Sequence, residues 1–227
     1  MTWTLPYISS QLITTCLLVS GFGSSLIGAD SGIEQFTSDV AFCDVRVGYG
    51  SAARSASISS TSTTTGKNQD SSFTWDSTGR LSLLVLPPPG HASDTARGLW
   101  GFEAATVRNH DDGGQGGQSL DLRQLQLLIH LGMGWMASQR TTIELTTFGG
   151  PSVAWQVGGS RGSLGDGWQV GLRLGAAYTW DQGFQIHGGL LALYDQAQLT
   201  LGRGGENWSA KLTERGVAPT IGVGWRF

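Results

Sequence analysis

Residues 219–227 read PTIGVGWRF, and this stretch decides the class of fold. Large apolar side chains occupy every second position, and they are Ile221, Val223, Trp225 and Phe227. A period of two predicts a β-strand with one apolar face, because successive side chains of a strand point to opposite sides. Such a face must be covered, either by the core of a soluble protein or by membrane lipid.

The composition favours lipid. Only 14% of the 227 residues are charged, against about 25% in an average soluble domain, which is too few for the solvated outer face of a soluble β domain. The net charge is −3 and no basic run is present, so nothing indicates a nucleic-acid partner. No window contains the roughly 18 consecutive apolar residues expected of a spanning helix. If the chain crosses a membrane, it does so as strands.

The alternation continues along most of the chain and predicts eight strands. They cover residues 43–59, 72–86, 97–109, 119–136, 141–157, 167–180, 184–200 and 208–227. The breaks between them are rich in glycine, serine, aspartate and asparagine, which favour turns. An even number of strands places both ends of a barrel on the same side.

The connections fall into two alternating classes. Long polar connections are predicted at 62–70, 110–118, 158–166 and 202–207, and the serine and threonine run at 55–65 is also interpreted as an exposed loop. Short turns are predicted at 137–140 and 181–183. Long loops at one rim and short turns at the other are typical of outer-membrane barrels. The exception is 87–96, whose three prolines indicate a rigid, extended cap.

Segment 168–180 separates its two faces most clearly, with an apolar stripe that begins at Trp168 and ends at Trp180. Aromatic rings at both ends of such a stripe suit the two membrane interfaces. The interface aromatics predicted in this way are Trp135, Trp155, Trp168, Tyr178 and Trp180. A soluble lipocalin-like barrel would show the same alternation, but its outer face would be glycine, alanine and glutamine with few charges. We therefore predict an all-β fold, an eight-stranded antiparallel transmembrane β-barrel.

The N-terminal 29 residues differ from the rest of the chain. Residues 12–26 are apolar and small, and Ala29 offers a cleavage point, which indicates a secretory signal peptide over 1–29. The first basic residue is Arg46, so the usual positive N-terminal region is missing. The alternative interpretation is a buried first strand or helix. An extension over 30–41 and a barrel domain over 42–227 complete the predicted organisation.

The segments 44–50 (DVRVGYG), 168–190 and 222–227 (GVGWRF) resemble strands of the small outer-membrane β-barrel proteins of Gram-negative bacteria, the superfamily with OmpA-type and OmpX-type barrels. The resemblance covers roughly residues 42–227. It implies a monomer in the outer membrane that is inserted by the barrel-assembly machinery. The assembly signal that it implies consists of Ile221, Val223, Trp225 and Phe227. The superfamily is functionally mixed, so the resemblance specifies no activity.

Charged residues recur on the inward side of the predicted strands. They are Arg46, Arg80, Glu103, His130, Glu144, Arg173, His187 and Arg226. Acids and bases are mixed, and Arg80 and Glu103 lie on neighbouring strands at similar depth. Because an eight-stranded barrel has room inside for side chains and little more, we expect a salt-bridged network that closes the lumen. The alternative is a narrow polar path between glycine-lined walls.

These features predict a non-enzymatic outer-membrane protein with a structural or surface-interaction role, whose outer loops meet an extracellular ligand. A narrow porin-like channel for small polar solutes is the alternative. A lipid-modifying or proteolytic enzyme has less support, because the histidines at 91–93 (HAS) and 110–112 (HDD) lie in polar connections. No cofactor is predicted, and His110, Asp111 and Asp112 are adjacent residues that do not define a metal geometry. Outer-membrane lipid is the expected surrounding.

Overall fold

The computed structural model describes residues 43–87, 96–112, 119–157, 165–203 and 205–227. The predicted signal peptide, the extension over 30–41 and most of the proline-rich connection lie outside these residues. The described part is one antiparallel sheet of ten strands, and no helix in it is long and apolar enough to cross a membrane. The strands are β1 (Asp44–Ser51), β2 (Ala53–Ser62), β3 (Asn68–Thr74), β4 (Ser77–Leu86), β5 (Ala96–Asp111), β6 (Leu120–Met136), β7 (Thr141–Gln156), β8 (Gly165–Thr179), β9 (Phe184–Arg203) and β10 (Glu206–Arg226).

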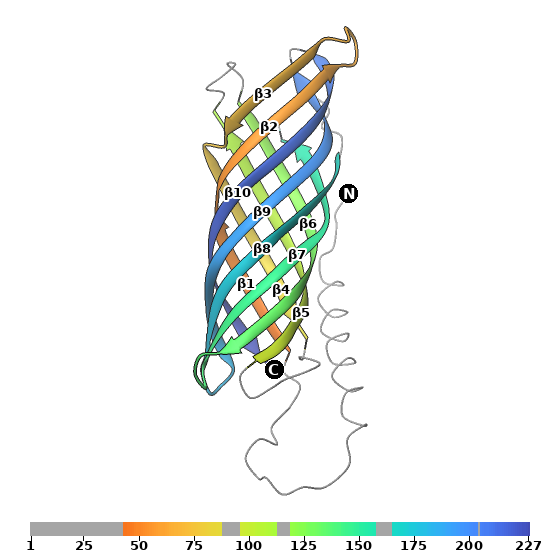
Figure 1. Cartoon of the computed structure of the whole chain (residues 1–227). Helices are drawn as coiled ribbons and strands as arrows, with labels where there is room; N and C mark the ends of the chain where they lie inside the picture. The colour runs from red at the N-terminus through yellow and green to blue at the C-terminus, as the bar shows by residue number, and fades with distance from the viewer. Residues whose placement is uncertain (1–42, 88–95, 113–118, 158–164, 204) are drawn as a thin grey trace, which may run out of the picture.

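Eight of the strands form a closed ring. Their order is β1-β4-β5-β6-β7-β8-β9-β10, and β1 pairs with β10 to close it, with Val47 opposite Val223. The result is a tall, tilted barrel (Figure 1), and the predicted eight-stranded antiparallel barrel is confirmed. The turns at 137–140 and 180–183 lie at the lower rim together with the C-terminus, and the β2–β3 hairpin stands at the upper rim.

The β2–β3 hairpin corrects two parts of the sequence prediction. Residues 60–62 and 68–70, predicted only as loop, are strand, and the turn is confined to 63–67. Residues 55–59, predicted both as the end of a strand and as part of the serine and threonine loop, are strand. Predicted loop 202–207 is likewise mostly strand, since β9 ends at Arg203 and β10 begins at Glu206. Serine, threonine and other polar residues face both sides here, so the hydropathy pattern carries no alternation although the backbone pairs normally.

The predicted strands 43–59 and 72–86 are each divided in two. Residues 52–54 stand opposite the four residues 75–78, so the second strand carries one extra residue. A bulge of this kind bends a strand and increases its twist. Pro219 directly precedes Thr220, where the pairing of β10 with β1 ends, and it lacks the N–H that a continuous ladder would need. Above the break, β2 pairs with β10 and β3, and β3 is the edge of the sheet among the described strands.

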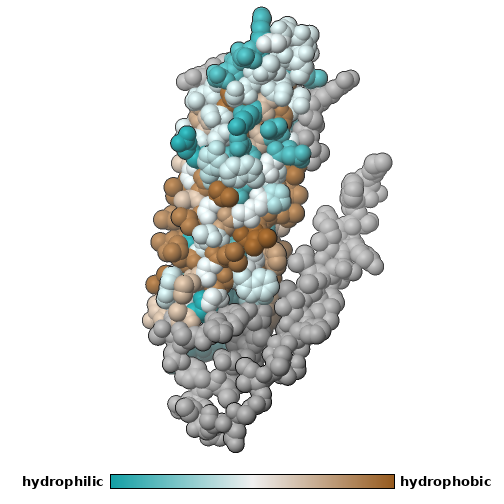
Figure 2. All heavy atoms as spheres, turned by 45° about the vertical axis from the view of Figure 1, so that its right-hand side comes forward, coloured by the Kyte–Doolittle hydropathy of each residue, from teal (hydrophilic) through white to brown (hydrophobic). Residues whose placement is uncertain are grey.

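The outward face of the barrel is apolar in its lower part and polar in its upper part (Figure 2). Leu131, Leu172 and Leu174 are each at least half exposed, as lipid-facing side chains are. Higher up, exposed outward positions are polar, as at Ser59, Gln198 and Lys211. β9 has 20 residues and β10 has 21, whereas crossing a bilayer takes about 9–11. The barrel wall therefore continues above the membrane.

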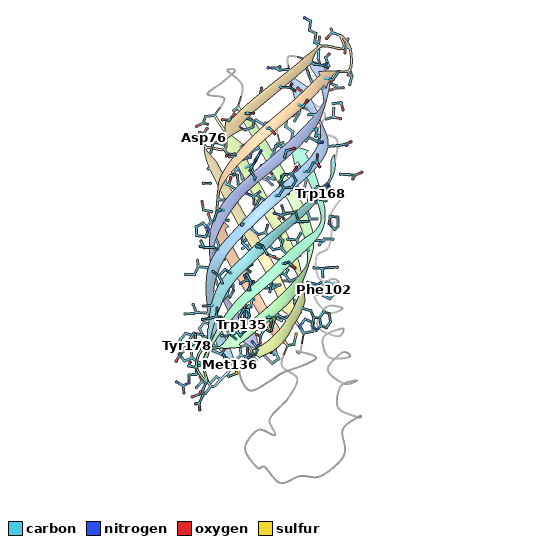
Figure 3. The ribbon with its side chains drawn as sticks, in the orientation of Figure 1. Asp76, Phe102, Trp135, Met136, Trp168 and Tyr178 are labelled. Carbon is cyan, nitrogen blue, oxygen red and sulfur yellow. The ribbon has the colours of Figure 1, made fainter. Side chains whose placement is uncertain are left out.

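Aromatic rings gather at the two borders of the apolar band. Near the lower rim, Trp180 contacts Tyr178 and Phe184, with ring centroids 4.7 and 5.2 Å apart. Figure 3 shows Trp135 and Tyr178 at this end and Trp168 much higher on the wall, where its ring lies 5.4 Å from that of Tyr194. Trp155, on the outward side of β7, is half-buried. This is the distribution that two membrane interfaces favour.

The abundance of glycine has a packing reason in β10. A side-chain carbon at Gly222 would lie 2.1 Å from the carbonyl oxygen of Val47 and 2.5 Å from Nε2 of His187. At Gly224 it would meet the side chain of Arg46 at 2.8 Å. Inward glycines thus leave the space that large charged side chains of the neighbouring strands occupy.

The lipid-facing band predicts a contrast between two substitutions. Leu172→Arg, in the band on β8, should destabilise the folded barrel by about 2–4 kcal/mol, because it places a charge in hydrocarbon. Gln198→Arg, exposed on the polar upper wall of β9, is the matched control and should change the stability little. Urea unfolding in phospholipid vesicles measures both, and equal effects at the two positions would contradict the assigned band.

Candidate functional site

The interior of the barrel is the candidate site, because charged and amide side chains converge there. The structure places all eight sequence-predicted residues inside; Arg226 is half-buried near the lower rim and the other seven are buried. Further inward polar residues were not named from the sequence. Apart from serines and threonines, they are Asp44, Arg54, Arg97, Asn109, Gln124, Gln126, Gln169, Gln185, Asp195 and Glu214.

The lower cluster is centred on Arg46. Its Nη1 donates to Oε2 of Glu144 at 2.6 Å and its Nη2 to Oε1 at 2.7 Å, a bidentate pair between β1 and β7 on opposite parts of the ring. Nη2 also reaches Asp44 at 3.0 Å. Arg226 holds the same Asp44 carboxylate with two bonds of 2.7 and 3.0 Å. These bonds tie distant strands together across the lower lumen.

The middle cluster is centred on Glu103. Nη2 of Arg80 donates to one carboxylate oxygen at 2.9 Å, and Nε2 of His130 lies 2.6 Å from the other. The imidazole of His130 stacks on Phe148, with ring centroids 5.2 Å apart. Arg80 also donates to the side-chain oxygen of Gln126, which connects this cluster to the one above.

The upper cluster is centred on Glu214. Its carboxylate accepts hydrogen bonds from Gln124 at 2.6 Å, from Asn109 at 2.8 Å and from the indole of Trp75. Arg54 lies 3.7 Å away and is completely buried. Gln126 then donates to Gln124 at 3.1 Å and to Asp195 at 3.0 Å.

Two apolar layers separate and cap these clusters. The lower one lies between the middle and upper clusters and contains Ala52, Leu128, Phe148, Leu191, Leu193 and Ala218. The upper one lies above Glu214 and contains Ala56, Ile58, Trp75, Leu122, Leu199, Ala210 and Leu212. Along β6 the inward sequence shows the order directly, since Leu122, Gln124, Gln126, Leu128 and His130 follow one another. Apolar and hydrogen-bonded layers together fill the lumen.

At the upper rim, the predicted HDD motif forms a small surface cluster. His110 lies 2.6 Å from Asp121 and 2.7 Å from Asp112. The backbone N–H of Asp112 donates to the carboxylate of Asp76, which stands at the break between β3 and β4 (Figure 3). Within the described ranges, no three histidine, cysteine or carboxylate side chains are placed to hold a metal ion. The HAS motif at 91–93 lies outside those ranges.

Alternation of side chains along each strand would have identified most of the interior residues that were missed, because every second residue faces the lumen. Glu214 lies twelve residues before Arg226 on the same strand, and Asp195 lies eight after His187, so each shares a face with a residue already placed inside. Arg54 shares the inward face of Arg46, eight residues before it, because β1 and β2 pair with β10 in one continuous register and the extra residue lies between β3 and β4. The sequence placed Arg80 and Glu103 on neighbouring strands at similar depth, and their 2.9 Å ion pair confirms that placement. Partners across the ring, such as Arg46 and Glu144, are 98 residues apart and could not be matched from the sequence.

Comparisons with known proteins identify the fold. No protein-family model matches the sequence, and comparison with curated proteins gave no match. Among solved structures, the outer-membrane protein OprG from Pseudomonas aeruginosa is similar with a TM-score of 0.57 and 15% identity, over 82% of this chain and 96% of OprG. The chain has the fold of a small outer-membrane β-barrel. The band of exposed apolar side chains around the wall agrees with this fold.

Two other barrels match at lower similarity. Neisserial surface protein A covers 77% of this chain and 96% of its own, with 12% identity and a TM-score of 0.37. Ail of Yersinia pestis covers 81% of this chain and 98% of its own, with 11% identity and a TM-score of 0.35.

The middle cluster generates a stability prediction. Glu103→Ala should destabilise the barrel by about 3–5 kcal/mol, because it leaves the buried guanidinium of Arg80 without its carboxylate. Asp181→Ala is the control. It breaks the exposed 2.7 Å pair with Arg140, and such surface pairs contribute at most about 1 kcal/mol. Chemical unfolding compares the two variants. A Glu103→Ala barrel as stable as the wild type would remove this pair from the set of stabilising contacts.

The rim cluster predicts a dependence on pH. His110 stands above the apolar band, and its hydrogen bond to Asp121, followed by that to Asp112, raises the pKa of the imidazole. A raised folded-state pKa gives stability that is fully present below the unfolded value of about 6.5 and is lost as pH rises through the folded value. The unfolding midpoint of wild type should therefore exceed that of His110→Gln at pH 6, and the difference should shrink by pH 9. A difference that grows with pH would contradict this assignment.

Proposed function

We propose that this protein is a closed, non-conducting barrel with a structural or surface-interaction role that involves its upper rim. The observation that carries the proposal is the filling of the lumen. Three hydrogen-bonded clusters, centred on Arg46, Glu103 and Glu214, fill the lumen together with two apolar layers, one below and one above the Glu214 cluster. A solute would have to break buried ion pairs and displace the side chains of two apolar layers.

The upper wall supports the second half of the proposal. The strands continue above the apolar band, and the β2–β3 hairpin extends this wall with exposed side chains such as Ser57, Thr61 and Asn68. Rigid polar surfaces of this kind can offer hydrogen bonds to an extracellular ligand, whereas lipid-facing surfaces cannot. The proposed role is non-enzymatic and monomeric. The non-enzymatic part is supported by the rim imidazole of His110, whose described side-chain partners are the carboxylates of Asp121 and Asp112 and include no hydroxyl or thiol nucleophile.

A narrow channel for small polar solutes is the second candidate. It is favoured by a small cavity among the lower charged residues and by the glycines that line the same wall, such as Gly48 and Gly222. For conduction, the Arg46–Glu144 pair and the apolar layer around Leu128 and Phe148 would have to move together.

Single-channel recording separates the two candidates. The sample is refolded wild-type barrel whose shift in gel mobility on boiling shows that it is folded, and a large porin in the same planar bilayer is the positive control. The closed barrel should give no discrete conductance steps. Reproducible steps of one size from verified folded protein would overturn the proposal and establish the channel.

A further inference from the structure

Arg173 of β8 is buried without a carboxylate partner. Among the ion pairs within 4.0 Å in the described structure, none includes this residue. Its Nη2 lies 3.3 Å from Nδ1 of His187. Because a guanidinium can only donate, Nδ1 must accept, and the imidazole is then neutral with its proton on Nε2. His187 therefore binds Arg173 but does not balance its charge.

The nearby carboxylates are already bound to other groups. Both oxygens of Glu144 accept from Arg46, at 2.6 and 2.7 Å. The two oxygens of Glu103 are taken by Arg80 and His130. Both attract Arg173 from a distance, but neither forms an ion pair with it.

The lower lumen as a whole carries an excess of positive charge. Its four arginines, Arg46, Arg97, Arg173 and Arg226, face the two carboxylates Asp44 and Glu144. Arg97 also lacks enough acceptors, since its buried Nε and Nη2 have no hydrogen-bond partner among the described residues. An unbalanced charge in a low-dielectric interior is costly, and a counter-ion removes most of that cost.

A small cavity lies beside Arg173. Its charged and polar wall consists of Arg46, Ser82, Glu103, Arg173, His187 and Thr220, and the rest is Gly48, Leu84 and Leu191. The free space at its centre is about that of one water molecule. A space of this size suits a monatomic ion and is too small for oxyanions such as phosphate or sulfate.

We propose that this cavity binds one small monatomic anion, of which chloride is the abundant example, as the counter-ion of Arg173. The guanidinium supplies charge and directed N–H donors, and the hydroxyl of Ser82 lies on the same wall. The site goes beyond the proposed closed barrel, which stands whether or not the anion is bound. It makes the anion part of the filling of the lower lumen.

Bromide is the direct probe, because it replaces chloride and scatters X-rays anomalously. Crystals of the wild-type barrel grown in sodium bromide should show one anomalous peak within hydrogen-bonding distance of the Arg173 guanidinium. No peak there, or a peak only at Arg97 and Arg226 near the lower mouth, would overturn the assignment. The measurement uses the unaltered chain, so it does not depend on how a variant folds.

A thermal measurement supplies the matched test. At constant ionic strength in detergent, replacing isethionate with chloride should shift the melting temperature of the wild type upward in a saturable way. Arg173→Met keeps the aliphatic bulk but removes the charge, and its melting temperature should not respond to chloride. Arg140→Met, in the exposed lower turn, should respond like the wild type. A chloride effect that is absent in the wild type, or equal in all three proteins, would refute the site.

Discussion

The closed ring of backbone hydrogen bonds is the constraint on which the rest of this structure depends. In hydrocarbon an unpaired N–H or C=O has no water to bind, so the strands must pair on both sides. The β1–β10 seam, with Val47 opposite Val223, completes this pairing around the barrel. Where the wall rises above lipid the constraint is relaxed, and there the sheet has an edge strand, β3, among the described residues. The location of this edge therefore follows from the solvent around it.

Closure of a ring of only eight strands also determines the interior. Its bore accommodates side chains and little else, and charged groups turned away from lipid must satisfy one another there. The structure meets this need with bidentate and shared contacts, such as those of Arg46 with Glu144 and of Glu103 with Arg80 and His130. Glycines such as Gly222 and Gly224 give these large side chains room against the wall. The high glycine content thus follows from the need to fit large polar side chains inside a narrow barrel, and the low charge content follows from the lipid-facing exterior.

The sequence predicted the ring and its inward faces because lipid and lumen impose opposite demands on alternate residues. The stripe from Trp168 to Trp180 shows this contrast most clearly. The full length of the β2–β3 hairpin was not predicted, because serine and threonine stand on both of its faces near the turn, and backbone pairing shows that the strands continue to Ser62 and from Asn68. Neighbouring-strand partners such as Arg80 and Glu103 could be matched from the sequence. Partners across the lumen could not, because they depend on the shear and tilt of the barrel. Arg173 lies on the inward face of its strand, as the ion-paired residues do. Only the three-dimensional arrangement shows that Arg173 itself forms no ion pair.

The central claim is that ion pairs across the lumen hold a filled barrel together, and the coupling between Arg46 and Glu144 tests it most directly. A double-mutant cycle with Arg46→Met and Glu144→Gln, followed by reversible unfolding in lipid vesicles, measures that coupling. The account predicts a coupling free energy of at least about 1.5 kcal/mol, as expected of a close, desolvated charge pair. Effects that add within about 0.5 kcal/mol would show that the pair contributes no mutual stabilisation, and the filled, ion-paired lumen would be contradicted.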